Sequence, residues 1–399
     1  MTVIGTRLPG EIRTAADPQT GRTLRQLTSA PANSYPLYYF IPTITPDGDK
    51  LIFYSERSGW VQLYAMDLEN GAMVQLSEGR TRDSGWAIWC EHRLRGVYNH
   101  LAALNGSRRE VYYFQDEEVR STHIDSLENR LVHAMPGRMP IGQSGFSPDG
   151  KLFAFIHADR ARFTQALADR EALLNMRQPF DFQAWRNENP CTIGLIETET
   201  GAYRDVMEVP FHVHHVFFIA NDRLLVNHVQ GENGMWSVGV DGSGARVLRP
   251  RGEGHGAICH QVFTERGIFY EANEDVDGQR RVWIGHYNPA TDAFQEAVLP
   301  GVGYIHTGRD PGGRMAFYEN QMGTGVHQLL NVRHPLDPAR SQVEVLRELA
   351  PIVRGQRFHA HPFLGPGRRW LYFTEVINGF SQVCALDVAD LASEDQWTA

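Results

Sequence analysis

Residues 42–79 read PTITPDGDKLIFYSERSGWVQLYAMDLENGAMVQLSEG and hold the clearest structural unit in the chain. Segments of strand length are separated by turn sequences, among them Pro46-Asp47-Gly48 and Asn70-Gly71. Val, Ile, Leu and aromatic residues make each segment better suited to a β-strand than to a helix. The stretch therefore predicts a four-stranded meander of about 40 residues, which is the size of one β-propeller blade.

The same order of strand, turn and strand returns along the chain. Clear copies begin near Gly145, His214, His260, His306 and His361. A weaker copy near Trp86, WAIWCEHRLRGVYN, fills the gap after the first unit and brings the count to seven. We therefore predict an all-β, seven-bladed β-propeller. A pair of β-sandwiches is the weaker alternative, because it gives no reason for a recurring period.

The two ends of the chain fit one closed ring. Residues 23–28 (TLRQLT) resemble the fourth strand of a blade but stand alone before the first complete unit. The last unit, which ends near Leu391, lacks a fourth strand of its own. We expect residues 1–399 to form a single domain in which the N-terminal strand completes the last blade and removes exposed strand edges.

One segment interrupts the repeats. Residues 160–189 read RARFTQALADREALLNMRQPFDFQAWRNEN, and ALADREALLNM has apolar residues at helical spacing among good helix formers. We expect a short helical insertion between strands of the third blade, over one face of the ring. Such an insertion either shapes a binding site or only packs against the ring, and the sequence leaves both open.

Composition and charge limit the partners. Hydrophobic residues make up 42% of the chain, and 38 glycines and 21 prolines favour turns over long helices. The net charge of −9 disfavours nucleic acid, because phosphate binding needs excess Lys and Arg. The sequence shows no membrane span or signal peptide, and its four cysteines form no CxxC pair. We expect a cytoplasmic monomer or homodimer with no membrane partner.

Histidines gather where the predicted blades begin. They open consecutive units at His212, His214 and His215, at His260, at His306, and at His359 and His361. The first strand of a blade lines the central channel, so these side chains converge at one mouth. We place RFHAHPF (357–363) in a strand, which turns the two histidines of that segment to the same face.

This arrangement predicts a metal site. A single histidine is more often a hydrogen-bonded channel residue than a ligand, but packing does not require His at equivalent places in adjacent blades. We predict that His306, Gln356, His359 and His361 bind a divalent metal. The neutral set suits manganese, zinc, nickel or iron, and the ligand types alone do not decide between these metals. Cys259 is expected to point away from His260, because side chains alternate along a strand.

The chain resembles the oligogalacturonate lyases, seven-bladed propellers that cleave oligogalacturonates by β-elimination. The resemblance covers nearly the whole chain and includes TPDGDKLIFYSE, NPCTIGLIETETG and the final QRFHAHPF. The last of these carries the family's Gln-x-x-His-x-His metal motif as Gln356, His359 and His361. The resemblance places the family's fourth ligand at His306.

The resemblance also implies catalytic and substrate-binding residues. The family's active-site histidines fall on His260 and on His228, which precedes Gln230-Gly231. Arg309 and Arg357 lie close to ligand positions and could bind a substrate carboxylate, although both are equally consistent with solvated rim residues. His214 is a further candidate for substrate binding.

Two positions depart from the family pattern. Gly234 precedes Met235-Trp236, where the family's proposed catalytic arginine is expected. Residues 35–40 (YPLYYF) replace a second basic residue of the first blade. His260 and His228 are then the nearest candidates for the base, since a neutral imidazole accepts protons near pH 7.

We therefore predict a metal-dependent lyase that acts on an acidic oligosaccharide. Elimination at a uronate removes the C5 proton, which is acidic only when the adjacent carboxylate is neutralised, and a metal with neutral ligands can do this. Two alternatives stay open. One is a metal-containing propeller that hydrolyses, isomerises or epimerises another sugar, and the other is a non-catalytic carbohydrate-binding propeller.

Overall fold

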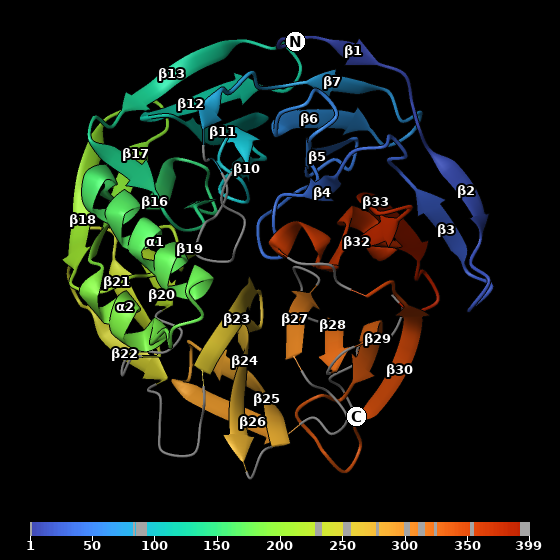
Figure 1. Cartoon of the computed structure of the whole chain (residues 1–399). Helices are drawn as coiled ribbons and strands as arrows, with labels where there is room; N and C mark the ends of the chain where they lie inside the picture. The colour runs from blue at the N-terminus through green and yellow to red at the C-terminus, as the bar shows by residue number, and fades with distance from the viewer. Residues whose placement is uncertain are drawn as a thin grey trace.

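The computed structural model describes residues 2–82, 84, 94–227, 234–249, 257–276, 279–298, 304–309, 316–322, 325–351 and 355–391. Within these ranges the strands form seven antiparallel sheets arranged in a ring, with one short hairpin beside them (Figure 1). Each sheet is one blade. The predicted seven-bladed β-propeller is therefore confirmed.

Blades 1 to 3 come from the first half of the chain. Blade 1 contains β1 (Arg7–Leu8), β7 (Met73–Gln75), β6 (Gln62–Asp67), β5 (Lys50–Ser55) and β4 (Ser34–Pro36). Blade 2 contains β10 (Ala103–Asn105), β11 (Glu110–Gln115), β12 (Glu118–His123) and β13 (Asn129–Ala134). Blade 3 contains β14 (Arg138–Pro140), β15 (Gly145–Phe146), β16 (Leu152–Asp159), β17 (Cys191–Glu197) and β18 (Tyr203–Val209).

Blades 4 to 6 are simple four-stranded meanders. Blade 4 contains β19 (His215–Ala220), β20 (Arg223–Asn227), β21 (Met235–Gly239) and β22 (Arg246–Arg249). Blade 5 contains β23 (Ala257–Thr264), β24 (Gly267–Val276), β25 (Gln279–Asn288) and β26 (Ala293–Val298). Blade 6 contains β27 (Tyr304–Arg309), β28 (Ala316–Met322), β29 (Val326–Arg333) and β30 (Gln342–Glu348).

Blade 7 joins segments from both ends of the chain. It contains β31 (Phe363–Leu364), β32 (Trp370–Ile377), β33 (Phe380–Asp387), β3 (Thr23–Gln26) and β2 (Arg13–Ala16), with the short helix η3 (Pro366–Arg368) between β31 and β32. β3 pairs with β33, so that Leu24 lies opposite Leu386. The backbone N–H of Leu27 continues the pairing and donates to the Val383 carbonyl at 2.8 Å.

The second blade begins later than the sequence predicts. Its inner strand is β10, and the weak copy near Trp86 is not that strand. The described end of that copy forms β9 (Arg95–Gly96), which pairs with β8 (Thr81–Arg82) in a separate two-stranded sheet. Residues 111–114 (VYYF) are fully or almost fully buried, so β11 provides the apolar strand that the blade needs.

Two helices occupy the predicted insertion in the third blade. α1 (Arg160–Asn175) and α2 (Phe182–Glu188) connect β16 to β17 and lie over one face of the ring (Figure 1). Asp159 caps α1 by accepting a hydrogen bond from the backbone N–H of Arg162 at 2.9 Å. Among the described residues, no helix is long and apolar enough to span a membrane.

The inner strands are interrupted near the centre of the ring. In blade 1, β4 and Ile44 pair with β5, while residues 37–41 leave the sheet between them. In blade 3, β14 and β15 pair with β16 on either side of residues 141–144. Bulges and gaps of this kind change the direction of side chains. The residues at the centre therefore do not follow simple strand alternation.

Candidate metal centre and the surrounding histidines

Histidines from three blades meet at the centre of the ring. His260 belongs to β23, His306 to β27, and His359 and His361 precede β31. The ring centroid of His306 lies 4.3 Å from that of His260, 4.8 Å from that of His359 and 4.4 Å from that of His361. The structure thus brings together four histidines that the sequence singles out.

The segment with Gln356 reaches this point by an unexpected backbone path. Gln356–Phe358 form the short helix η2, and β31 begins only at Phe363, so the predicted strand through RFHAHPF is wrong. His361 has a left-handed backbone conformation with φ of 44°. The rings of His359 and His361 nevertheless stack at 5.5 Å, and His361 Nε2 lies 3.1 Å from Gln356 Oε1.

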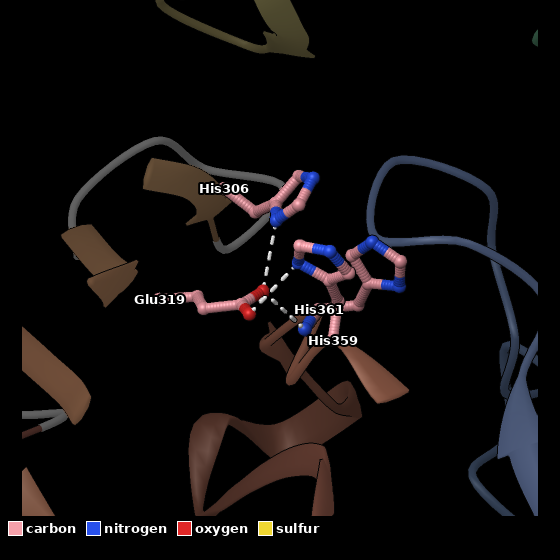
Figure 2. Close-up of side chains that lie close together, drawn as sticks. All are labelled: His306, Glu319, His359 and His361. Carbon is pink, nitrogen blue, oxygen red and sulfur yellow. Dashed lines mark hydrogen bonds and ion pairs between the residues drawn. The ribbon is translucent and has the colours of Figure 1, made fainter. Parts of the chain in front are cut away.

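A buried carboxylate that was not predicted from the sequence lies against these histidines. Glu319 on β28 pairs directly with His306 on β27, and its Oε2 lies 2.8 Å from His306 Nδ1 (Figure 2). Its Oε1 lies 3.0 Å from His359 Nδ1 and 2.9 Å from His327 Nε2. The backbone N–H of His361 donates to Oε2 at 3.1 Å. Glu319 therefore connects β27, β29 and the segment before β31.

Burial and neighbouring groups determine the charges at this site. Burial alone would raise the pKa of Glu319, but His359 and His306 lower it well below its usual range. Burial lowers the pKa of His306 to about 3, and the charge of His260 acts in the same direction. Burial also lowers the pKa of His361 well below its usual value. Neutral imidazoles of this kind are the form that ligates metals.

The residues present fit a divalent metal. One donor atom from each of His306, Glu319, His359 and His361 lies within 4.8 Å of the others. Glu319 engages the Nδ1 side of His306 and of His359, so Nε2 would be the nitrogen that each ring offers to a metal. Gln356 Oε1 and His361 Nε2 are two further donors beside them. Imidazoles oriented by a carboxylate behind them are typical of protein metal sites.

Blade 5 repeats the pairing of a histidine with a carboxylate. His260 Nδ1 lies 2.5 Å from Glu271 Oε1, and Cys259 Sγ lies 3.0 Å from the same oxygen. The prediction that Cys259 points away from His260 is therefore wrong. A register shift between Cys259 and Val262 and the left-handed backbone of His260, with φ of 50°, break the alternation of the strand.

A sequence signal for both carboxylates exists in the second strand of each blade. β24 begins GIFYE and β28 begins AFYEN, so each glutamate directly follows an apolar run. The strand pairing places Glu319 opposite His306 and Glu271 opposite Cys259. The register between the two strands is needed to recognise the pairs, because a lone Glu after an apolar run is typical of a strand end at the surface.

Aromatic side chains cover the histidines from the side of blade 1. Residues 38–40 (YYF) belong to the segment that leaves the sheet. The ring centroid of Tyr39 lies 5.3 Å from that of His306, 5.7 Å from that of His260 and 5.8 Å from that of His361. The stretch that replaces a basic residue of the family pattern thus forms part of the wall of the site.

The remaining predicted site residues are Arg357, Arg309, His228 and His214. Arg357 forms an ion pair with Glu56 of blade 1, with Nη1 2.6 Å from Oε1. Arg309 is the last residue of β27. His228 lies outside the described residues. His214 is buried under the insertion, where Arg186 Nη2 lies 3.2 Å from its Nε2.

The fold and the histidine-rich centre define a seven-bladed propeller of a kind already seen in solved structures. An oligogalacturonate lyase from Vibrio parahaemolyticus matches with a TM-score of 0.76 and 18% identity, over 97% of this chain and 99% of that one. An oligogalacturonate lyase in complex with manganese matches with a TM-score of 0.77 and 16% identity, over 98% and 100%. A puromycin hydrolase matches more weakly, with a TM-score of 0.53 and 13% identity, over 93% of this chain and 57% of that one.

No protein-family model and no curated protein matches the chain by sequence. At identities this low, the likeness to solved structures establishes a common fold. It confirms the predicted resemblance to oligogalacturonate lyases in structure, over nearly the full length of both chains.

Proposed function

We propose that the chain is a metal-dependent lyase that cleaves acidic oligosaccharides of the oligogalacturonate type by β-elimination. The observation that carries the proposal is the convergence of His306, His359, His361 and Gln356 on one buried point, with Glu319 behind them. A similar fold over nearly the full length occurs in an oligogalacturonate lyase that is in complex with manganese.

The proposed metal ligands are His306, Gln356, His359 and His361, with manganese as the expected ion and zinc, nickel or iron as alternatives. All four ligands are neutral, so a bound cation would keep a net positive charge for an anionic substrate even with the carboxylate of Glu319 behind the imidazoles. A divalent cation here would neutralise the uronate carboxylate and make the C5 proton more acidic. Glu319 acts as a positioning residue, because it holds two of the imidazoles by their Nδ1 side.

His260 is the proposed base. Its ring lies 4.3 Å from that of His306, and its Nδ1 contacts Glu271, so Nε2 is the nitrogen that faces a bound sugar. Nε2 takes the C5 proton, the electron pair of the C5–H bond forms the C4=C5 double bond, and the bond from C4 to the glycosidic oxygen breaks. Glu271 stabilises the imidazolium that results. His228 stays a second proposed catalytic residue.

Substrate binding is proposed for His214, Arg309 and Arg357. Of these, Arg357 already pairs with a carboxylate of this chain, Glu56, at 2.6 Å. It would have to exchange that partner for a substrate carboxylate. His214 lies on the segment that leads into blade 4, beside the helical insertion.

The test measures the ultraviolet absorbance of an unsaturated uronate released from a panel of oligouronides by protein supplied with Mn²⁺. Wild type is expected to release it, and His306→Ala and His359→Ala are expected to lose both bound metal and product. Absence of unsaturated product from every substrate would contradict the lyase. Unchanged metal content in both variants would contradict the metal site.

A further inference from the structure

Arg186 on α2 is buried where the insertion meets blade 4. Its side chain is 0% exposed, and it is the largest fully buried side chain among the described residues. Its Nη2 lies 3.2 Å from His214 Nε2, and its carbonyl accepts a hydrogen bond from the backbone N–H of His212 at 2.9 Å. Both ends of the residue are thus fixed to the segment that leads into β19.

The insertion lies at the same mouth of the ring as the histidines. In blade 4 the last residue of the second strand, Asn227, pairs with the first residue of the inner strand, His215. Antiparallel pairing therefore places the end of a second strand level with the start of the inner strand. Because α1 and α2 leave from the end of β16, they emerge at the mouth where the inner strands begin (Figure 1).

Arg186 interacts electrostatically with residues on the inner strands of blades 4 and 5. Burial lowers the pKa of Arg186 to about 9, and Cys259 partly offsets this, so the guanidinium is still cationic at pH 7. Burial, His260 and His306 lower the pKa of His215, and Arg186 acts in the same direction. A buried positive charge therefore lies within electrostatic range of His215 and Cys259.

A buried amide lies beside the same segment. Gln143, in the gap between β14 and β15, donates its backbone N–H to the His214 carbonyl at 3.0 Å and pairs with His215. Its side chain is fully buried, and neither Oε1 nor Nε2 has a hydrogen-bond partner among the described residues. A buried polar group without a partner costs about 1–3 kcal/mol, and a bound polar ligand would remove that cost.

We propose that Arg186, His214 and Gln143 form a carboxylate-binding subsite for a second uronate ring of the substrate. The inference rests on the proposed function, since it assumes an acidic oligosaccharide. The metal centre neutralises one carboxylate, but an oligouronide carries one on every ring. An arginine fork matches a carboxylate in geometry and charge, and Gln143 offers both a donor and an acceptor.

Access to the subsite follows from access to the metal centre. Arg186 and His306 are both 0% exposed, so a substrate can contact either residue only after neighbouring side chains move. A substrate that reaches His306 has to displace side chains packed at the mouth, such as the aromatic residues 38–40. We expect the same movement of side chains to give the second uronate of the substrate access to Arg186.

The experiment compares the binding of galacturonate and digalacturonate by calorimetry. It uses the full chain supplied with Mn²⁺, with His260→Gln as the background that prevents turnover. Arg186→Gln is expected to weaken the binding of digalacturonate by about 10- to 100-fold and to leave galacturonate unchanged, because only the dimer reaches the subsite. The affinity of Arg186→Lys for digalacturonate is expected to lie between those of the unsubstituted Arg186 protein and Arg186→Gln. The matched control is Arg177→Gln, which removes an exposed arginine of the same insertion and leaves both affinities unchanged.

Gln143→Leu is the second variant, for the case that Arg186→Gln does not fold. It is expected to weaken digalacturonate binding by about 5- to 10-fold at unchanged galacturonate affinity. An equal loss of affinity for both sugars, or no loss of affinity for digalacturonate, would contradict the proposed subsite. If Arg186→Gln without the His260 substitution forms unsaturated product with an unchanged KM, the subsite is contradicted and the proposed lyase activity is supported. If digalacturonate binding depends on Arg186 but wild type forms no unsaturated product, the subsite is supported and the proposed lyase activity is contradicted.

Discussion

His306 and Glu319 face each other across the two inner strands of blade 6, with Nδ1 and Oε2 2.8 Å apart (Figure 2). One blade earlier, His260 and Glu271 repeat the pair at 2.5 Å. Both carboxylates are completely buried and hold the Nδ1 side of their histidine. Neighbouring blades thus orient two imidazoles in the same way, one as a proposed metal ligand and the other as the proposed base.

Glu319→Gln is expected to lower the affinity for Mn²⁺ by about 10- to 100-fold, because the ligand imidazoles lose the carboxylate that orients them. Titration of chelated protein with Mn²⁺ measures this. The matched control is Glu375→Gln in blade 7, a buried carboxylate that pairs with Arg347 at 2.9 Å. Wild-type affinity in Glu319→Gln would show that the glutamate does not position the ligands.

His260→Gln is expected to slow product formation by about 10²- to 10⁴-fold, the usual contribution of a general base. Glu271→Gln is expected to have a smaller effect, because the imidazole remains. Initial rates and bound metal are measured together, and both variants are expected to retain metal. A rate near that of wild type in His260→Gln would assign proton abstraction to another group, and His228 would then be tested in the same way.

The repeat of strands predicts most of the fold, because each blade is a local meander with its own turns. Residues 42–79 and the copies near His260 and His306 correspond to real blades. The second blade was placed too early because the copy near Trp86 also contains an apolar run and lies before the buried VYYF strand (residues 111–114) in the sequence. Local pattern does not reveal which of two neighbouring apolar runs enters the ring.

The centre of the site was harder to predict, because it depends on departures from regular strands. His260 and His361 have left-handed backbone conformations, so alternation gives the wrong orientation for Cys259 and the wrong element for residues 356–362. Glu319 reaches the centre through strand register, and Arg186 reaches His214 through the insertion. Both features become visible only once the chain is folded.

Leu27→Ala is expected to destabilise the ring by about 2–5 kcal/mol, because the side chain is 0% exposed and lies at the junction of the two chain ends. The midpoint of urea denaturation measures the change. Val3→Ala, at a residue that is 52% exposed, is the control and is expected to change stability by less than about 0.5 kcal/mol. An unchanged midpoint in Leu27→Ala would mean that the pairing of β3 with β33 adds little to stability.

Removal of the metal is expected to lower the melting temperature without unfolding the propeller, because the blades pack through apolar clusters built from residues other than the proposed ligands. A ligand at 100 times its Kd stabilises the folded state by about 2.7 kcal/mol. Circular dichroism with chelator should therefore show retained strand structure and a lower Tm, and Mn²⁺ should restore it. His359→Ala is expected to abolish the shift, whereas Arg177→Gln keeps it. Identical melting temperatures with chelator and with saturating Mn²⁺ would mean that the folded chain does not hold the ion.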